Sequence, residues 1–211
     1  MKKSILALCA LTLAAGLSAC GGGTSSYTIG GTVDGLQYPG LVLTNNLSDD
    51  VNVAPLGLND DKTAIRTVSY QFSKQLDYGE PYSVTIKKQP EHQVCQAAGG
   101  NAETAGRLST INAAFVCNLV ANSIGGTITG LAADGLILNN GGIQLPVTKA
   151  ADTAAYPTAF VFGSPVTYDQ TYGVTVLVQP TGQTCTVTNG AGIMKDNPVT
   201  TISVNCVRNP T

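Results

Sequence analysis

The stretch from Ile29 to Asn45 reads IGGTVDGLQYPGLVLTN, and 95 residues later Ile124 to Asn140 reads IGGTITGLAADGLILNN. The two stretches share their glycines, their alternation of apolar residues and their closing asparagine. A second matching pair follows, Val68 to Cys95 and Thr158 to Cys185, with the offset reduced to 90 residues. Self-similarity at a nearly fixed period is the mark of a duplicated structural unit, so the chain is predicted to contain two copies of a unit of about 90 residues.

Short apolar runs alternate with polar residues in each copy, and clusters of Gly, Pro, Asn and Asp separate them. Alternation with a period of two is typical of strands that bury one face, and no long helical pattern intervenes. The sequence predicts an all-β fold of two tandem antiparallel β-sandwich domains, in residues 27–121 and 122–211. In the first copy we expect strands at 28–34, 40–45, 51–54, 66–73, 81–88, 93–97 and 110–118.

Features that recur in both copies have backbone explanations. Gly30-Gly31 and Gly125-Gly126 indicate a bulge or a close approach of chains at the start of a strand. Gln-Pro at 89–90 and at 179–180 is expected to end a strand, because proline cannot donate to a β-ladder. The linker between the copies, residues 120–123, is short enough to restrict the two domains to a narrow range of end-to-end orientations.

The N-terminal region combines Lys2 and Lys3, an apolar run from Ile5 to Gly16 and the sequence Leu17-Ser18-Ala19-Cys20. It resembles the signal sequence and lipobox of bacterial lipoproteins. This resemblance implies that residues 1–19 are a cleaved signal peptide and that Cys20 begins the mature chain.

Lipidation of Cys20 follows from the same resemblance, with a thioether-linked diacylglycerol and an N-acyl chain such as palmitate, and residues 20–26 then form a Gly/Ser tether. Several acyl chains together give a stable membrane anchor. Gly21 stands where inner-membrane lipoproteins usually carry Asp, which favours the outer membrane. An ordinary secretory signal, in which Cys20 has no role, is the alternative.

The charge of the chain excludes one class of partner. Lys2 and Lys3 leave with the leader, so nine basic side chains remain against 13 acidic ones, and charged residues make up only 11% of the sequence. This balance gives neither the basic footprint of a nucleic-acid-binding protein nor a polybasic membrane patch.

The cysteines indicate a disulfide framework. Cys9 leaves with the leader and Cys20 is lipidated, so two cysteines remain in each copy: Cys95, Cys117, Cys185 and Cys206. Four cysteines permit three connectivities, and duplication favours one bond within each copy, Cys95 with Cys117 and Cys185 with Cys206. A four-cysteine metal site is the alternative, but it lacks Cys-x-x-Cys pairs in an exported chain.

The two copies share a motif whose full pattern is GGTV-x-GL, GLVL-x-NN, F-x-F, Y-x-VTV, QP-x-GQ-x-C, NG-x-G and V-x-V-x-C. It resembles a repeat of uncharacterised bacterial surface lipoproteins and adhesin-like proteins, which implies immunoglobulin-like or prealbumin-like sandwiches. The second copy fits this pattern best, through Phe160, Phe162 and Gly182-Gln183. The first copy departs from it at Tyr70 and at Glu91-His92, which affects its loops and not its framework.

Residues able to support catalysis are scarce. His92 is the sole histidine and lies in a Pro-Glu-His-Gln turn, whereas the second copy has Gly182 there, so we interpret His92 as an exposed turn residue. Asp49-Asp50 and Asp60-Asp61 are interpreted as solvated loop tips, with a calcium site as the alternative. No catalytic residue, cofactor or metal ligand is predicted, since the sequence lacks the usual hydrolase, zinc and phosphate-loop motifs.

Recurring aromatic residues are predicted to pack in the core rather than to form a sugar-stacking platform. They are Tyr70, Phe72, Tyr78, Tyr82, Phe160, Phe162, Tyr168 and Tyr172. Tyr82 and Tyr172 are further expected to anchor their hydroxyls at a corner where a strand begins.

Together these features predict a non-catalytic outer-membrane lipoprotein that serves as a surface structural or binding module, with adhesion as one form of that role. Its expected partners are the membrane, through Cys20, and a protein or carbohydrate of the cell envelope, with no nucleic acid. A periplasm-facing accessory lipoprotein in envelope assembly is the alternative, and a carbohydrate-active enzyme is the remote one.

Overall fold

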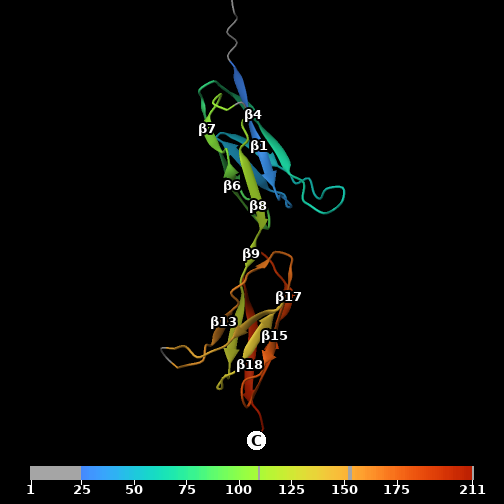
Figure 1. Ribbon diagram of the computed structural model, residues 1–211, viewed down its shortest axis with the longest axis vertical. Coiled ribbons are helices and arrows are strands. Elements are labelled where there is room, and N and C mark those ends of the chain that lie inside the picture. Colours follow the sequence, from blue (N-terminus) through green and yellow to red (C-terminus); the bar gives the residue numbers. More distant parts are fainter. Residues whose placement is uncertain (1–24, 109, 152–153, 211) are drawn as a thin grey trace, which may run out of the picture.

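The computed structural model describes residues 25–108, 110–151 and 154–210. Cys20 and the signal peptide lie outside these residues. The described part is built of strands and turns, and it contains no helix long and apolar enough to cross a bilayer. The all-β prediction is confirmed: the strands form two sandwich-like domains, one after the other along the chain (Figure 1).

The first domain comprises two four-stranded sheets, in the orders β4-β1-β8-β6 and β3-β2-β5-β7. Its strands are β1 (Ser26–Asp34), β2 (Leu41–Asn45), β3 (Asp49–Val53), β4 (Val68–Asp77), β5 (Pro81–Lys88), β6 (Gln93–Gly99), β7 (Ala102–Thr104) and β8 (Ala114–Leu119). Six of the seven expected strands lie close to their predicted positions. The expected strand at 110–118 begins only at Ala114, and the three-residue β7 was not foreseen from the sequence.

The second domain repeats this arrangement, with sheets β13-β10-β18-β16 and β12-β11-β15-β17. Its strands are β10 (Ile124–Thr129), β11 (Ile137–Asn140), β12 (Ile143–Pro146), β13 (Ala159–Val161), β15 (Thr171–Val178), β16 (Gln183–Thr188), β17 (Ala191–Ile193) and β18 (Val199–Arg208). Strands β5 and β15 end immediately before Gln89-Pro90 and Gln179-Pro180, as predicted.

Each domain buries its own core between its two sheets. Alternate residues of the strands point inward, and this is why the period-two pattern of the sequence located them. The first core is centred on Ile29, Leu36, Leu41, Leu43 and Phe115, and the second on Ile124, Leu136, Leu138, Met194 and Ile202. The two cores are separate clusters, so each domain supplies its own apolar burial.

One strand pair in each otherwise antiparallel sandwich is parallel. In the first domain β1 pairs with β8, with Val33 opposite Phe115, and in the second β10 pairs with β18 over a longer stretch. The glycine pairs lie where these strands meet. A Cβ atom at Gly31 would collide with the carbonyl of Ala113, and one at Gly126 would collide with the carbonyl of Ile202. The register also shifts at both glycine pairs, so the predicted close approach and bulge both occur.

A disulfide joins the last two strands of each first sheet. Cys95 of β6 lies opposite Cys117 of β8, and Cys185 of β16 lies opposite Cys206 of β18. All four side chains are buried. The structure therefore has the intradomain pairing expected from duplication, and each bond fastens the edge strand to the strand that pairs with β1 or β10.

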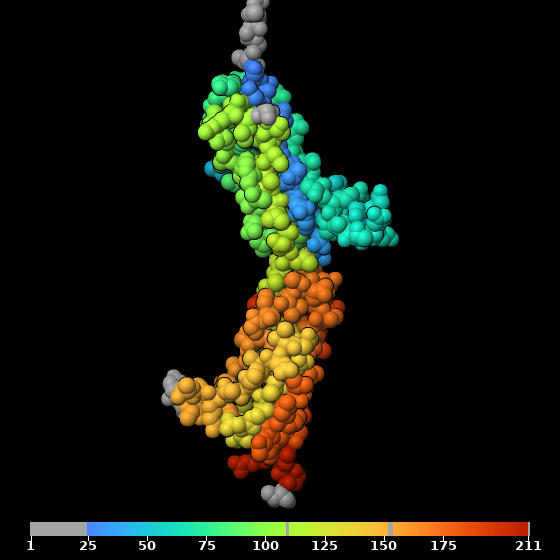
Figure 2. All heavy atoms as spheres, in the orientation of Figure 1, coloured from blue at the N-terminus to red at the C-terminus, as the bar shows by residue number. Residues whose placement is uncertain are grey.

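The two domains are arranged end to end along the long axis of the molecule (Figures 1 and 2). The C-terminus lies at the far pole of the second domain, opposite the pole of the first domain from which β1 starts (Figure 1). The linker is hydrogen-bonded: β9 (Ala121–Asn122) pairs with β14 (Val166–Thr167) of the second domain. It therefore continues the second domain instead of hanging free.

The close approach at Gly126 makes a stability prediction. The variant Gly126→Ala should lower the free energy of unfolding by about 2 kcal/mol, because its Cβ forces β10 away from β18. Urea unfolding of the full chain measures this change. Gly163→Ala is the matched control, since open space surrounds its Cβ position. Equal unfolding midpoints for the two variants would contradict the prediction.

The disulfides make a second prediction. Replacing Cys185 and Cys206 together by alanine should destabilise the second domain by about 3 kcal/mol, because the bond closes a loop that the unfolded chain otherwise leaves open. The residues are 21 apart in sequence. Amide exchange in β16 and β18 should rise, whereas exchange in β6 and β8 should not. Unchanged protection of β16 would count against the prediction.

Candidate functional site

Several residues shared by the two copies have structural tasks. The side-chain amide of Gln89 donates to the carbonyl of Cys95 at 3.0 Å and accepts from its N–H at 2.8 Å. Gln179 makes the same two bonds to Cys185, at 3.0 and 2.7 Å. The Gln-Pro motif therefore ends one strand and, through its glutamine, holds the next strand at its cysteine.

The second glutamine of the motif fixes a turn. Gln93 is only 2% exposed, and its amide oxygen accepts from the N–H groups of Gln37 and Tyr38 at 2.8 and 3.0 Å. Its amide nitrogen donates to the carbonyl of Gly35 at 2.8 Å. Gln183 makes equivalent bonds to the turn after β10, both at 2.8 Å. A buried amide satisfied in this way stabilises the loop that crosses from one sheet to the other.

The closing asparagines of the motif act in the same manner. Asn45 accepts the N–H of Ser83 at 3.1 Å, and Asn140 accepts the N–H of Gly173 at 2.9 Å. The glutamines and asparagines of the repeated motif thus hydrogen-bond to the backbone of their own domain. Residues that differ between the domains are the better candidates for function.

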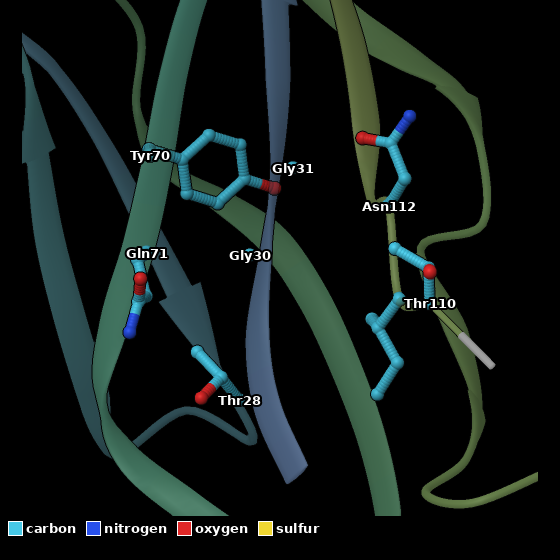
Figure 3. Close-up of a pocket in the computed structure, with 8 residues that line it drawn as sticks. Thr28, Gly30, Gly31, Tyr70, Gln71, Thr110 and Asn112 are labelled. Carbon is cyan, nitrogen blue, oxygen red and sulfur yellow. The ribbon is translucent and has the colours of Figure 1, made fainter. Parts of the chain in front are cut away.

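A hollow of about 370 Å³ lies beside the first glycine pair (Figure 3). The hydroxyl of Tyr70 points toward the strand pair and donates to the carbonyl of Ala113 at 2.6 Å, and burial raises the pKa of this hydroxyl. The other residues around the hollow are uncharged: Thr28, Gly30, Gly31, Gln71, Thr110, Ile111 and Asn112. A hollow of about 270 Å³ lies beside the glycine pair of the second domain. We attribute both hollows to the missing glycine side chains.

His92 lies in a turn, as predicted, but that turn is at the junction of the two domains and the side chain is partly buried instead of exposed. Its ring stacks on that of Tyr168 in the second domain, with centroids 3.9 Å apart and planes 9° from parallel. Its Nδ1 lies 2.9 Å from both carboxylate oxygens of Asp196. Tyr38 packs edge-on against both rings, at centroid distances of 4.9 and 5.7 Å. The side chain of His92 is consequently only 25% exposed.

Charged groups surround this aromatic cluster. Desolvation raises the pKa of the Tyr168 hydroxyl, and the carboxylates of Asp196, Asp169 and Glu91 raise it further. The ammonium of Lys195 lies 5.6 Å from the centre of the same ring. His92 therefore has a carboxylate within hydrogen-bond distance of its Nδ1, a stacking partner and an edge-on aromatic neighbour. These contacts join residues of the first domain to residues of the second, so we interpret the cluster as a structural joint.

The acidic pairs do not behave alike. Asp49 lies buried in β3, where its carboxylate accepts from the hydroxyl of Ser73 at 2.9 Å and the N–H of Lys74 at 3.0 Å, so the loop-tip interpretation was wrong for it. Asp50 pairs with Lys87, and this hydrogen bond lowers the pKa of Asp50. Within the described ranges no three His, Cys, Asp or Glu residues gather as a metal site.

Asp60 and Asp61 occupy the tip of an ordered side arm, residues 54–67, which projects from the first domain between β3 and β4 (Figure 2). Asn59 holds the tip: its side-chain oxygen accepts the N–H groups of Thr63 and Ala64 at 2.8 and 3.2 Å. Leu56 and Leu58 are 50% and 46% exposed. The arm thus presents apolar and acidic side chains on a defined backbone.

The aromatic prediction holds for part of the set. Tyr70, Phe72, Tyr82, Phe160 and Phe162 are buried in the cores. Tyr78 is 71% exposed, however, and Tyr168 belongs to the junction. The expected anchor at Tyr82 is absent, because its buried hydroxyl has no hydrogen-bond partner among the described residues.

Comparison with known proteins yields similarity of structure only. No protein-family model matches the chain, and no curated protein matches it. Among solved structures, the pilus adhesin SpaC of Lactobacillus rhamnosus GG is 9% identical over 88% of this chain, with a TM-score of 0.33. The chain spans 31% of the length of that protein. GBS52, the minor pilin of Streptococcus agalactiae, is 12% identical over 88% of this chain and 98% of its own, with a TM-score of 0.24.

The side arm makes a local prediction. Asn59→Ala should disorder the tip of the arm without changing the free energy of global unfolding, because its bonds stay within residues 59–64. Amide exchange at Thr63 and Ala64 should accelerate by about tenfold, the loss of roughly 1.4 kcal/mol of protection. Exchange in β4 is the internal control. Faster exchange across the whole first domain would refute a purely local role.

Proposed function

We propose that this chain is a non-catalytic lipoprotein of the outer membrane, anchored through Cys20, that serves as a surface stalk and binding module. The observation that carries the proposal is the end-to-end arrangement of the domains (Figure 1). A chain anchored near Ser26 would carry its far pole away from the membrane by the length of two sandwich domains. That geometry supports a spacer role.

Two further observations support a binding role without catalysis. The sole histidine packs at the domain junction, where its ring stacks on Tyr168 and its Nδ1 contacts Asp196, and a structural role accounts for both contacts. The side arm presents exposed Leu56 and Leu58 beside the framework. A protein or a carbohydrate of the envelope or of an outside surface is the proposed partner, and adhesion is the proposed form of contact.

Protease treatment of intact cells tests the proposal. The full-length protein with a C-terminal epitope should lose that epitope when a broad-specificity protease is added to intact cells, while a soluble periplasmic protein survives. Cys20→Ala should abolish retention in the membrane fraction, because the acyl chains provide the anchor.

Protection of the epitope until the outer membrane is opened would contradict surface exposure. It would instead favour the periplasm-facing accessory role in envelope assembly. Membrane retention of Cys20→Ala would contradict the lipid anchor, whichever side the domains face.

A further inference from the structure

The residues at the domain junction differ between the two copies on both of the surfaces that meet there. The residues that the first domain contributes to it, Tyr38 and His92, correspond in the second domain to Ala133 and Gly182. Gly182 lies beside the C-terminal segment, because the N–H of Asn209 donates to its carbonyl at 3.0 Å. The two large aromatic groups are thus present at the junction and absent from the equivalent positions of the second domain.

The backbone at His92 makes this substitution notable. His92 has a φ of 56°, and Gly182 has a φ of 66° at the corresponding place. Both lie in the left-handed region, which glycine adopts freely and other residues adopt at a cost. A side chain in this unfavourable conformation calls for a compensating contact, and the stack on Tyr168 supplies one.

The receiving surface has diverged as well. Backbone hydrogen bonds identify the equivalent positions: Asp169 donates to Met194 in the second domain as Gly79 donates to Ala105 in the first. By this alignment Asp196 corresponds to Arg107 and Tyr168 to Tyr78. Arg107 pairs with Glu103 of its own domain, so the carboxylate that receives His92 exists only at the junction.

The linker backbone adds a second layer of contacts. The N–H of Val120 donates to the carbonyl of His92 at 2.8 Å, and the carbonyl of Val120 accepts the N–H of Tyr168 at 2.7 Å. The amide of Asn122 donates to the carbonyl of Lys195 at 3.0 Å. One linker residue, Val120, is thus bonded to the backbone of both residues whose rings stack.

We propose that Tyr38, His92, Tyr168 and Asp196 form an interdomain clasp that holds the two domains in one orientation and makes the chain a rigid rod. Backbone bonds at Val120 fix the position of the linker, and the stacked rings with the His92–Asp196 contact prevent rotation about it. This inference goes beyond the proposed function, because the clasp acts wherever the chain is anchored and whatever it binds.

Distance measurement between the domains tests the clasp. Nitroxide labels are attached through an unnatural amino acid at Val94 in β6 and Val161 in β13, two exposed strand positions, in the full chain purified in detergent. Pulsed electron–electron double resonance then gives the distribution of distances between the two labels. The unsubstituted chain should show one narrow distribution, and His92→Gly and Tyr168→Ala should each broaden it by about twofold.

The matched control is Tyr78→Ala, which removes the residue equivalent to Tyr168 at a position outside the junction, where Tyr78 is 71% exposed. It should leave the distribution unchanged. Because Gly182 occupies the position of His92 in the second domain, His92→Gly should keep the first domain folded, with the amide protection of β6 and β8 intact.

Three results would overturn the clasp. The first is a distribution that stays narrow in both His92→Gly and Tyr168→Ala, and the second is one that is already broad in the unsubstituted chain. The third is loss of amide protection in His92→Gly, which would assign His92 to the stability of its own domain. The protease experiment tests on which side of the membrane the chain lies, whereas the distance measurement tests how its domains are joined. The proposed function and the clasp can therefore be contradicted independently.

Discussion

The close approach of a glycine pair to a neighbouring strand is the constraint on which each domain depends. Gly31 of β1 lies against the carbonyl of Ala113, just before β8, and Gly126 of β10 lies against the carbonyl of Ile202 in β18. Both approaches are too close for any side chain. The parallel pairing of β1 with β8 and of β10 with β18 continues from this point, and the strand register shifts beside the glycines. The disulfides then fasten β6 to β8 and β16 to β18. The surface hollow beside each glycine pair follows from the same absence of side chains.

Duplication separates framework from function in this chain. Residues that recur in both copies, such as Gln93 and Gln183, bond to backbone groups within their own domain. Such residues satisfy buried backbone groups, so losing one would lower the stability of its own domain. Residues present in one copy alone, such as Tyr38 and His92, are free of that demand. They are accordingly where contacts with something other than the domain's own framework occur.

The sequence predicted the strands and the disulfide pairing because both depend on local alternation and on the internal repeat. It missed β7, which has only three residues and gains its order from pairing with β5. It also misread His92, whose partner Asp196 lies 104 residues further along the chain. One signal was present: a histidine where the other copy has glycine, at a turn that requires a left-handed residue. Such a departure from the repeat indicates a contact outside the domain.

The same reasoning bears on how far the end-to-end arrangement can extend. The exit from the second domain repeats the backbone of the first, since Asn209 donates to the carbonyl of Gly182 as Val120 donates to His92. The side chains needed for a joint are missing there, because Ala133 and Gly182 replace Tyr38 and His92. The far pole therefore cannot form the junction described here with the first domain of another copy. The fold provides the geometry of a repeating filament, whereas its side chains permit one specific joint within each chain.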